Sequence, residues 1–190
     1  DVQVVVVTPD AALGKKAVAC PVIYLLHGYG GNAKTWIGVK PDLPQIADEK
    51  GIIFVCPDGK NSWYWDSPKD PSYRYETFVS SVLVKYIDGH YKTIADRKGR
   101  AITGLSMGGH GAMWNAIRHK DTFGAGGSTS GGVDIRPFPL NWDMSKQLGE
   151  FAYNKKVWDE HTVINQIDKI ENGDLAIIID CGEALSLIHI

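Results

Sequence analysis

A short strand, a tight turn and a helix are predicted by one segment, Arg100-Ala-Ile-Thr-Gly-Leu-Ser-Met-Gly-Gly109. Residues 100–103 are predicted as a short strand, and residues 109–119 have helical character. Ser106 has a glycine two positions before it and another two positions after it, which is the pattern of a nucleophile elbow. Such a turn is so tight that only small residues fit at those positions. The pattern predicts Ser106 as a nucleophile, and the alternative is an ordinary helix N-cap.

A second motif joins an apolar run to a glycine-rich loop. The run is Val22-Ile-Tyr-Leu-Leu26, typical of a strand buried on both faces, and the loop is His27-Gly-Tyr-Gly-Gly-Asn32. Such a loop can turn a backbone N–H toward the tip of a neighbouring strand, where acyl transfer needs donors for an oxyanion. We predict the N–H groups of Tyr29 and Met107 as these donors, with Gly30 as the alternative to Tyr29. The other interpretation is a glycine-rich turn without chemistry.

Strand and helix patterns alternate along the chain. The strands are predicted at residues 2–8, 22–27, 52–56, 100–103, 123–130 and 175–181, and the helices at 41–50, 75–90 and 109–119. Alternation of this kind predicts an α/β fold, in which a mostly parallel, twisted sheet carries helices on both faces. Ligands bind such sheets at the carboxyl ends of the strands, where Ser106 and the glycine-rich loop both fall. The length fits a single domain.

Composition excludes several classes of protein. The 190 residues are 44% hydrophobic and 22% charged, with a formal net charge of -2, which is typical of a globular domain. There is no basic run, so we expect no nucleic-acid partner, and no apolar stretch reaches the length of a membrane span. The three cysteines are widely spaced, so neither a disulfide framework nor a zinc site is expected. Composition decides neither the compartment nor the oligomeric state.

Six motifs between residues 20 and 183 together resemble the putative esterase family of α/β-hydrolases. The family includes tributyrin esterases, feruloyl esterases, S-formylglutathione hydrolases and, more distantly, mycolyltransferases. The motifs are Tyr24-Leu-Leu-His-Gly-Tyr-Gly-Gly-Asn32, Cys56-Pro-Asp-Gly59, Ser62-Trp-Tyr-Trp-Asp66, Tyr75-Glu-Thr-Phe78, Ile102-Thr-Gly-Leu-Ser-Met-Gly-Gly109 and Ile179-Asp-Cys-Gly182. The resemblance implies an α/β-hydrolase fold that needs neither metal nor organic cofactor.

The implied activity is that of a serine esterase, a carboxylic-ester hydrolase of the EC 3.1.1 type. It would act through an acyl-enzyme on a small-molecule ester, either a short-chain or a carbohydrate-linked acyl ester. The alternatives are an acyltransferase of the same fold, in which an acceptor replaces water, and a non-catalytic binding domain, because fold does not dictate function.

An aromatic stretch, Asn61-Ser-Trp-Tyr-Trp-Asp66, precedes Glu76. Trp63 and Trp65 are predicted to form an apolar wall for substrate, as the resemblance also implies, or to pack a long loop onto the body of the domain. Glu76 is predicted to support the substrate site, although a glutamate in the first turn of a helix is also favoured by the helix dipole.

Residues 131–154 lie where α/β-hydrolases insert caps. The segment contains two prolines and several aromatic residues, and insertions of this kind often shape substrate access. The alternative is a plain surface excursion.

A serine nucleophile needs a histidine base and an orienting acid, in the chain order Ser, acid, His. Relatives place the acid at the position of Leu185 and the base further on, so the chain departs from the family pattern here. Residues 185–190 also match the translated end of a sequencing transposon. We therefore expect a single native domain over residues 1–184, a foreign tail over 185–190, and an inactive chain that lacks acid and base. His110 and His119 read as structural, and His161 precedes the last strand. Asp180 lies in the strand itself and does not replace the acid, whereas Glu183 is the less favoured alternative that could reach the site.

Overall fold

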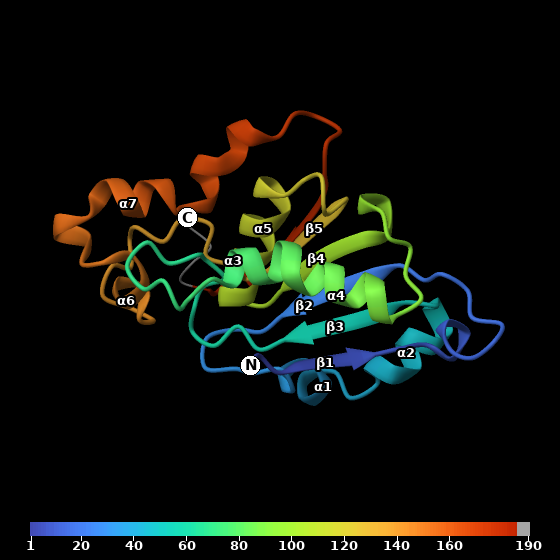
Figure 1. Cartoon of the computed structure of the whole chain (residues 1–190). Coiled ribbons are helices and arrows are strands. Elements are labelled where there is room, and N and C mark those ends of the chain that lie inside the picture. The colour runs from blue at the N-terminus through green and yellow to red at the C-terminus, as the bar shows by residue number, and fades with distance from the viewer. Residues whose placement is uncertain (186–190) are drawn as a thin grey trace.

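The computed structural model describes residues 1–185, in which six strands form one sheet (Figure 1). Their order across the sheet is β1-β3-β2-β4-β5-β6. The strand β1 runs antiparallel to β3, and all other neighbours are parallel. In chain order the strands are β1 (Val4–Val7), β2 (Val22–Leu26), β3 (Ile53–Pro57), β4 (Arg100–Gly104), β5 (Ala125–Thr129) and β6 (Ala176–Asp180). The predicted α/β fold is confirmed.

Helices and helical turns connect the strands. The α-helices are α1 (Thr35–Val39), α2 (Leu43–Lys50), α3 (Tyr75–Thr77), α4 (Leu83–His90), α5 (Met107–Arg118), α6 (Met144–Leu148) and α7 (Lys155–Glu160). A π-helical turn at Phe78–Val82 joins α3 to α4, so the helix predicted over residues 75–90 is one continuous rod with an altered middle. Short 3₁₀ helices lie at Asp10–Ala12, Arg97–Gly99, Phe151–Tyr153 and Val163–Lys169. None of the helices in residues 1–185 is both long and apolar enough to cross a membrane.

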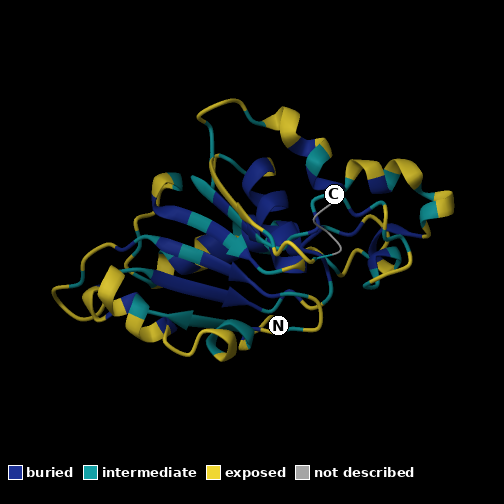
Figure 2. Ribbon diagram, turned by 180° about the vertical axis from the view of Figure 1, so that it is seen from behind, coloured by how far each residue is buried: buried dark blue, intermediate teal, exposed yellow. Residues whose placement is uncertain are grey.

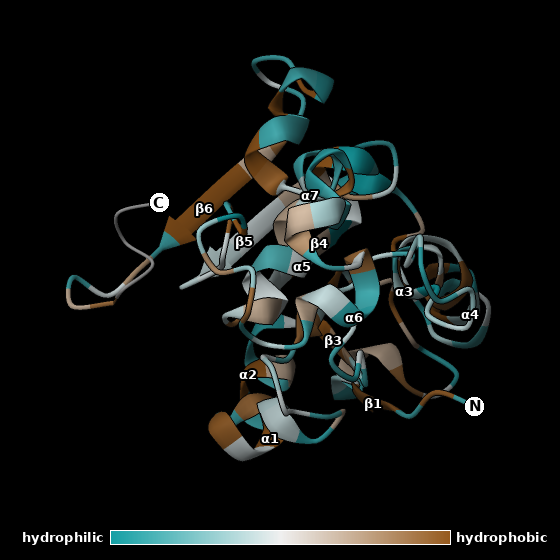
Figure 3. Ribbon diagram, turned by 90° about the vertical axis from the view of Figure 1, so that its left-hand side faces the viewer, coloured by the Kyte–Doolittle hydropathy of each residue, from teal (hydrophilic) through white to brown (hydrophobic). Residues whose placement is uncertain are grey.

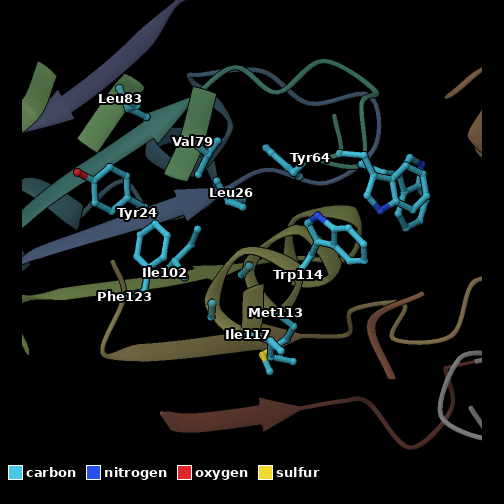
Figure 4. Close-up of a cluster of buried hydrophobic side chains, with 14 of the residues drawn as sticks. Tyr24, Leu26, Tyr64, Val79, Leu83, Ile102, Met113, Trp114, Ile117 and Phe123 are labelled. Carbon is cyan, nitrogen blue, oxygen red and sulfur yellow. The ribbon is translucent and has the colours of Figure 1, made fainter. Parts of the chain in front are cut away.

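The alternation of side chains along β2 builds two separate cores. Tyr24 and Leu26 point to the larger core, where they pack with Ile102, α4 and the buried face of α5 (Figure 4). Leu25 points to the opposite face and packs with Phe54 and residues of α2. Both faces of β2 and β3 are therefore covered, which explains their nearly continuous apolar sequences.

The other side of the sheet is covered unevenly. Every residue of β6 is exposed, and Figure 2 shows this strand beside the buried centre of the sheet. Ile178 is 76% exposed and Ile179 62% exposed, and β6 is the strongly hydrophobic strand at the edge in Figure 3. On the face away from α5, Thr103, Gly127 and Ile178 line an apolar hollow over β4, β5 and β6. Within the described residues, the half of the sheet formed by β4, β5 and β6 carries helices on one face only.

The domain organisation predicted from the sequence stays a prediction. The 131–154 segment contains the short helix α6 between β5 and α7. Of the predicted foreign tail, residues 186–190, including His189, lie outside the described residues, and Leu185 alone is described.

Candidate active site

Ser106 occupies a tight turn between the end of β4 and the start of α5. Its backbone angles are φ 55° and ψ −115°, a region that side chains other than glycine rarely adopt. The Ser106 N–H donates to the Thr129 carbonyl at 2.9 Å, and the Gly108 N–H donates to the Leu105 carbonyl at 2.8 Å. Ser106 itself is exposed. The turn therefore presents its side chain at the carboxyl end of the sheet.

The two glycines around this turn are required by close packing. A Cβ atom on Gly104 would overlap the Gly108 carbonyl, and a Cβ atom on Gly108 would overlap the Leu26 carbonyl. The strand β2 is in register with β4, with Leu26 opposite Gly104. The loop that follows β2 is thereby placed directly beside the Ser106 turn.

The glycine-rich loop meets Ser106 through Gly28. A Cβ atom on Gly28 would lie 3.5 Å from the Ser106 Cβ. The N–H groups of Tyr29 and Met107 donate no hydrogen bond within residues 1–185, whereas the Gly30 N–H donates to the Asn61 Oδ1 at 2.9 Å. Of the two candidate donors in the loop, Gly30 is thus already occupied. The peptide N–H of Tyr29 is available to a ligand.

His27 fixes the base of this loop. Its Nε2 accepts the Gly59 N–H at 2.9 Å, and its Nδ1 lies 2.7 Å from the Gly28 carbonyl. This pattern assigns a neutral ring with its proton on Nδ1, so the 3.5 Å approach of Nε2 to Asp58 is not an ion pair. The Tyr64 hydroxyl donates to the His27 carbonyl at 2.9 Å. His27 therefore has a structural task, and both of its ring nitrogens are engaged.

Comparison with known proteins identifies the family. The profile described as "Putative esterase" matches residues 1–188. The chain belongs to this family. An esterase of Mycobacterium tuberculosis is 28% identical over 169 residues, which are 80% of this chain and 36% of that protein. The S-formylglutathione hydrolase of Bos taurus is 25% identical over 197 residues, covering 92% of this chain and 66% of that enzyme.

A solved structure of a ferulic acid esterase has the same fold. It superimposes with a TM-score of 0.74 at 27% identity and covers 100% of this chain and 82% of its own. This esterase-family chain thus spans about a third of the mycobacterial relative and about two thirds of the bovine one.

The aromatic stretch of this family member packs inside the protein. Trp63 is 4% exposed and Trp65 is fully buried. Their rings stack on each other at 5.9 Å, and each meets the His110 ring edge-on at about 5 Å. This placement favours the packing role that the sequence left open. Burial lowers the pKa of His110 to about 3, so the ring is neutral among its aromatic neighbours.

Glu76 lies against the far end of α5. It accepts hydrogen bonds from the Trp114 Nε1 at 2.9 Å and the Arg118 Nε at 2.8 Å, and its Oε1 lies 2.8 Å from the His119 Nε2. Burial alone would raise the pKa of Glu76, but these partners outweigh it and lower the pKa to about 2. Trp114 is eight residues beyond Ser106, about 12 Å along the helix. The structure does not bring Glu76 together with Ser106.

No histidine of residues 1–185 is hydrogen-bonded to Ser106. His119 is bound to Glu76, and the His161 Nδ1 lies 2.7 Å from the Val157 carbonyl. His110 is enclosed by tryptophans. Among the carboxylates considered as the orienting acid, Asp180 is the last residue of β6, and its backbone carbonyl accepts a hydrogen bond from the Ser130 N–H. The described residues also hold no group of three His, Cys, Asp or Glu side chains arranged for a metal ion.

Sequence reasoning missed the residues that support the loop from outside. Asn61 and Tyr64 bind it from the aromatic stretch, and Asp143 accepts a hydrogen bond from the Tyr29 hydroxyl at 2.8 Å. Their polar side chains follow no spacing rule, because each partner lies at least 31 positions away along the chain. Asn61 and Tyr64 belong to the aromatic stretch that the sequence singles out, whereas Asp143 carries no such signal.

Proposed function

We propose that this esterase-family protein is a serine carboxylic-ester hydrolase that works through an acyl-enzyme. The observation that carries the proposal is the placement of Ser106. It sits on a strained, exposed turn beside a loop whose Tyr29 N–H has no partner within the described residues. Strained backbone in an exposed turn at a strand end is a frequent property of catalytic nucleophiles.

In the proposed reaction the Ser106 Oγ attacks the ester carbonyl while a base accepts its proton. The tetrahedral oxyanion accepts hydrogen bonds from the N–H groups of Tyr29 and Met107, which are fixed before reaction and therefore cost little reorganisation. The alcohol leaves with a proton, and water then attacks the acyl-enzyme to release the acid. We propose that the base and its orienting acid come from outside residues 1–185, because no described histidine is hydrogen-bonded to Ser106 and His90 lies at the far, C-terminal end of α4, beside the Tyr86 carbonyl.

For the substrate we propose short-chain or carbohydrate-linked acyl esters. This range of substrates is supported by two relatives named above, an S-formylglutathione hydrolase and a ferulic acid esterase, whose names indicate acyl groups bound to different leaving groups. An acyltransferase would share every step up to the acyl-enzyme, after which an acceptor alcohol replaces water.

The second candidate is a non-catalytic binding domain. One observation favours it: within residues 1–185 no histidine reaches Ser106. If the complete protein also lacks such a base, the Ser106 turn and the Tyr29 loop would bind an ester or acid without turning it over.

A fluorophosphonate probe separates these candidates. The chain is treated with probe in the presence and absence of added imidazole, which can act as an external base, and the labelled residue is mapped by mass spectrometry. We expect labelling at Ser106 that imidazole accelerates, no labelling of Ser106→Ala, and unchanged labelling of the control Ser81→Ala. Absence of label at Ser106 even with imidazole would contradict a nucleophilic role. Steady hydrolysis of p-nitrophenyl butyrate that Ser106→Ala abolishes would instead refute the missing base.

A further inference from the structure

We propose that Asp143 is a positioning residue for the oxyanion donor Tyr29, and the proposal rests on the function proposed above. The Tyr29 hydroxyl donates to the Asp143 Oδ2 at 2.8 Å, across 114 positions of sequence. The backbone of Tyr29 would hold the oxyanion while its side chain is bound to the 131–154 segment. One residue thereby links the reaction centre to the segment predicted to shape substrate access.

The loop needs such a restraint because of its sequence. Gly28, Gly30 and Gly31 surround Tyr29, and Gly30 has φ 77°. Glycine-rich backbone has many accessible conformations and loses more entropy on ordering than any other. An oxyanion donor, however, must be held within about 0.5 Å of its productive position. His27 holds the start of the loop and Asn61 holds the Gly30 N–H, and the Asp143 contact holds the side chain of Tyr29 between them.

Asp143 is itself held in place. The preceding residue, Trp142, accepts a hydrogen bond on its carbonyl from the buried Trp63 Nε1 at 3.1 Å, and its ring packs on Phe138 at 5.5 Å. Trp142 and Asp143 have φ 50° and 57°, so the chain turns sharply and presents the carboxylate. The Lys146 Nζ lies 3.0 Å from the other carboxylate oxygen. Because Asp143 is anchored to the aromatic core, its contact can restrain Tyr29 rather than follow it.

The electrostatics agree with a charged acceptor. The hydrogen bond from Tyr29, together with Lys146, holds the pKa of Asp143 below its usual value. The same bond raises the pKa of Tyr29, because Asp143 favours the protonated phenol. At neutral pH the pair is a phenol donating to a carboxylate, which is a stronger hydrogen bond than one between neutral groups.

The contact is tested first without chemistry, by hydrogen exchange of the amides in residues 27–32. Asp143→Gly removes the carboxylate while tolerating the left-handed backbone, and Tyr29→Phe removes only the hydroxyl. We expect each variant to accelerate exchange roughly three- to tenfold, with no further increase in the double variant. Asp143→Asn, which retains an acceptor oxygen, should restore slow exchange. The control Lys156→Ala, which removes an exposed lysine of α7 that does not contact Asp143, should exchange like the wild type. Unchanged exchange in Asp143→Gly would overturn the contact.

The positioning role is tested by the rate of fluorophosphonate labelling at Ser106, with imidazole present. We expect Asp143→Gly and Tyr29→Phe to slow labelling roughly three- to tenfold at saturating probe, with little change in the probe concentration that gives half the maximal rate. Asp143→Asn should recover most of the rate. Faster exchange with unchanged labelling would overturn the positioning role. If the wild type shows no label at Ser106, the proposed function fails and the positioning role with it, while hydrogen exchange still reports whether the contact exists.

Discussion

The strands β2 and β6 have similar apolar sequences but opposite surroundings. The β2 run, Val22-Ile-Tyr-Leu-Leu26, lies between two cores, whereas the β6 run, Ala176-Ile-Ile-Ile-Asp180, is exposed throughout. Apolar strands of a parallel sheet are normally covered on both faces. The difference divides the sheet into a covered half around β1, β2 and β3 and an open half that ends at β6.

The proposed site lies on the boundary between these halves. The Tyr29 loop follows β2 in the covered half, whereas Ser106 follows β4, the first strand of the open half, and the two strands are neighbours in the sheet. The acid that the sequence analysis expects near position 185 would follow β6, the most exposed strand. The proposed nucleophile and oxyanion donor therefore come from opposite sides of the boundary and are brought together by the pairing of β2 with β4.

The largest expected effect on the free energy of unfolding comes from the contact between the start of α5 and the end of β2, at the boundary between the two halves. Gly108→Ala should destabilise the protein by more than about 4 kcal/mol, because its Cβ would overlap the backbone of β2 rather than a side chain that can move. The matched control is Gly89→Ala in α4, where a Cβ meets nothing within 4 Å and helix propensity should add up to about 1 kcal/mol of stability. Urea unfolding measures both. A Gly108→Ala protein as stable as the wild type would mean that the first turn of α5 does not approach the end of β2 as closely as described.

The next effect compares the two halves directly. Ile53→Ala should cost about 3 kcal/mol, since this β3 side chain is fully buried and its loss leaves a cavity. Ile178→Ala in β6 should change stability by less than about 0.5 kcal/mol, because the side chain is 76% exposed. Both values come from urea unfolding at several protein concentrations. A large cost for Ile178→Ala would show that something covers the open face in solution.

The effect that is smallest near neutral pH is a pH dependence that comes from His110, a buried residue of α5. Folding lowers the pKa of His110 to about 3, whereas an unfolded histidine has a pKa near 6.5. Between these two pKa values the unfolded state binds a proton that the folded state does not bind. The free energy of unfolding therefore decreases as the pH falls from about 6.5 toward 3. The slope is at most about 1.4 kcal/mol per pH unit. His110→Phe should flatten the dependence of unfolding free energy on pH by that amount, and equal slopes in both proteins would contradict a neutral buried ring.

Local sequence patterns predict the elements of this fold well. Each of the six strands falls within two residues of its predicted bounds, because strand signals depend on neighbours along the chain. The helix expected over residues 41–50 begins at Leu43, with Pro44 in its first turn. The antiparallel direction of β1 was not predicted, since a strand carries no local signal for the direction of its partner.

The candidate site is less predictable because its contacts are long-range. The turn at Ser106 follows from the spacing of Gly104 and Gly108. The burial of Trp65, by contrast, depends on His110, and the partners of Glu76 come from a helix about 40 residues further on. Such contacts depend on side-chain directions across the assembled core, which no periodicity encodes.

Backbone strain in this protein is confined to one end of the sheet. Seven residues other than glycine have positive φ within residues 1–185, namely Lys60, Trp63, Tyr64, Ser106, Ser130, Trp142 and Asp143. All of them follow the carboxyl ends of β3, β4 or β5. Each such residue costs on the order of 1 kcal/mol or more, which glycine would recover. A search for heat-resistant variants should therefore enrich glycine at Ser130, whereas glycine at Trp142 or Asp143 would lose the packing on Phe138 or the bond to Tyr29. The gain at Ser130 would loosen the rim that we expect to carry the chemistry.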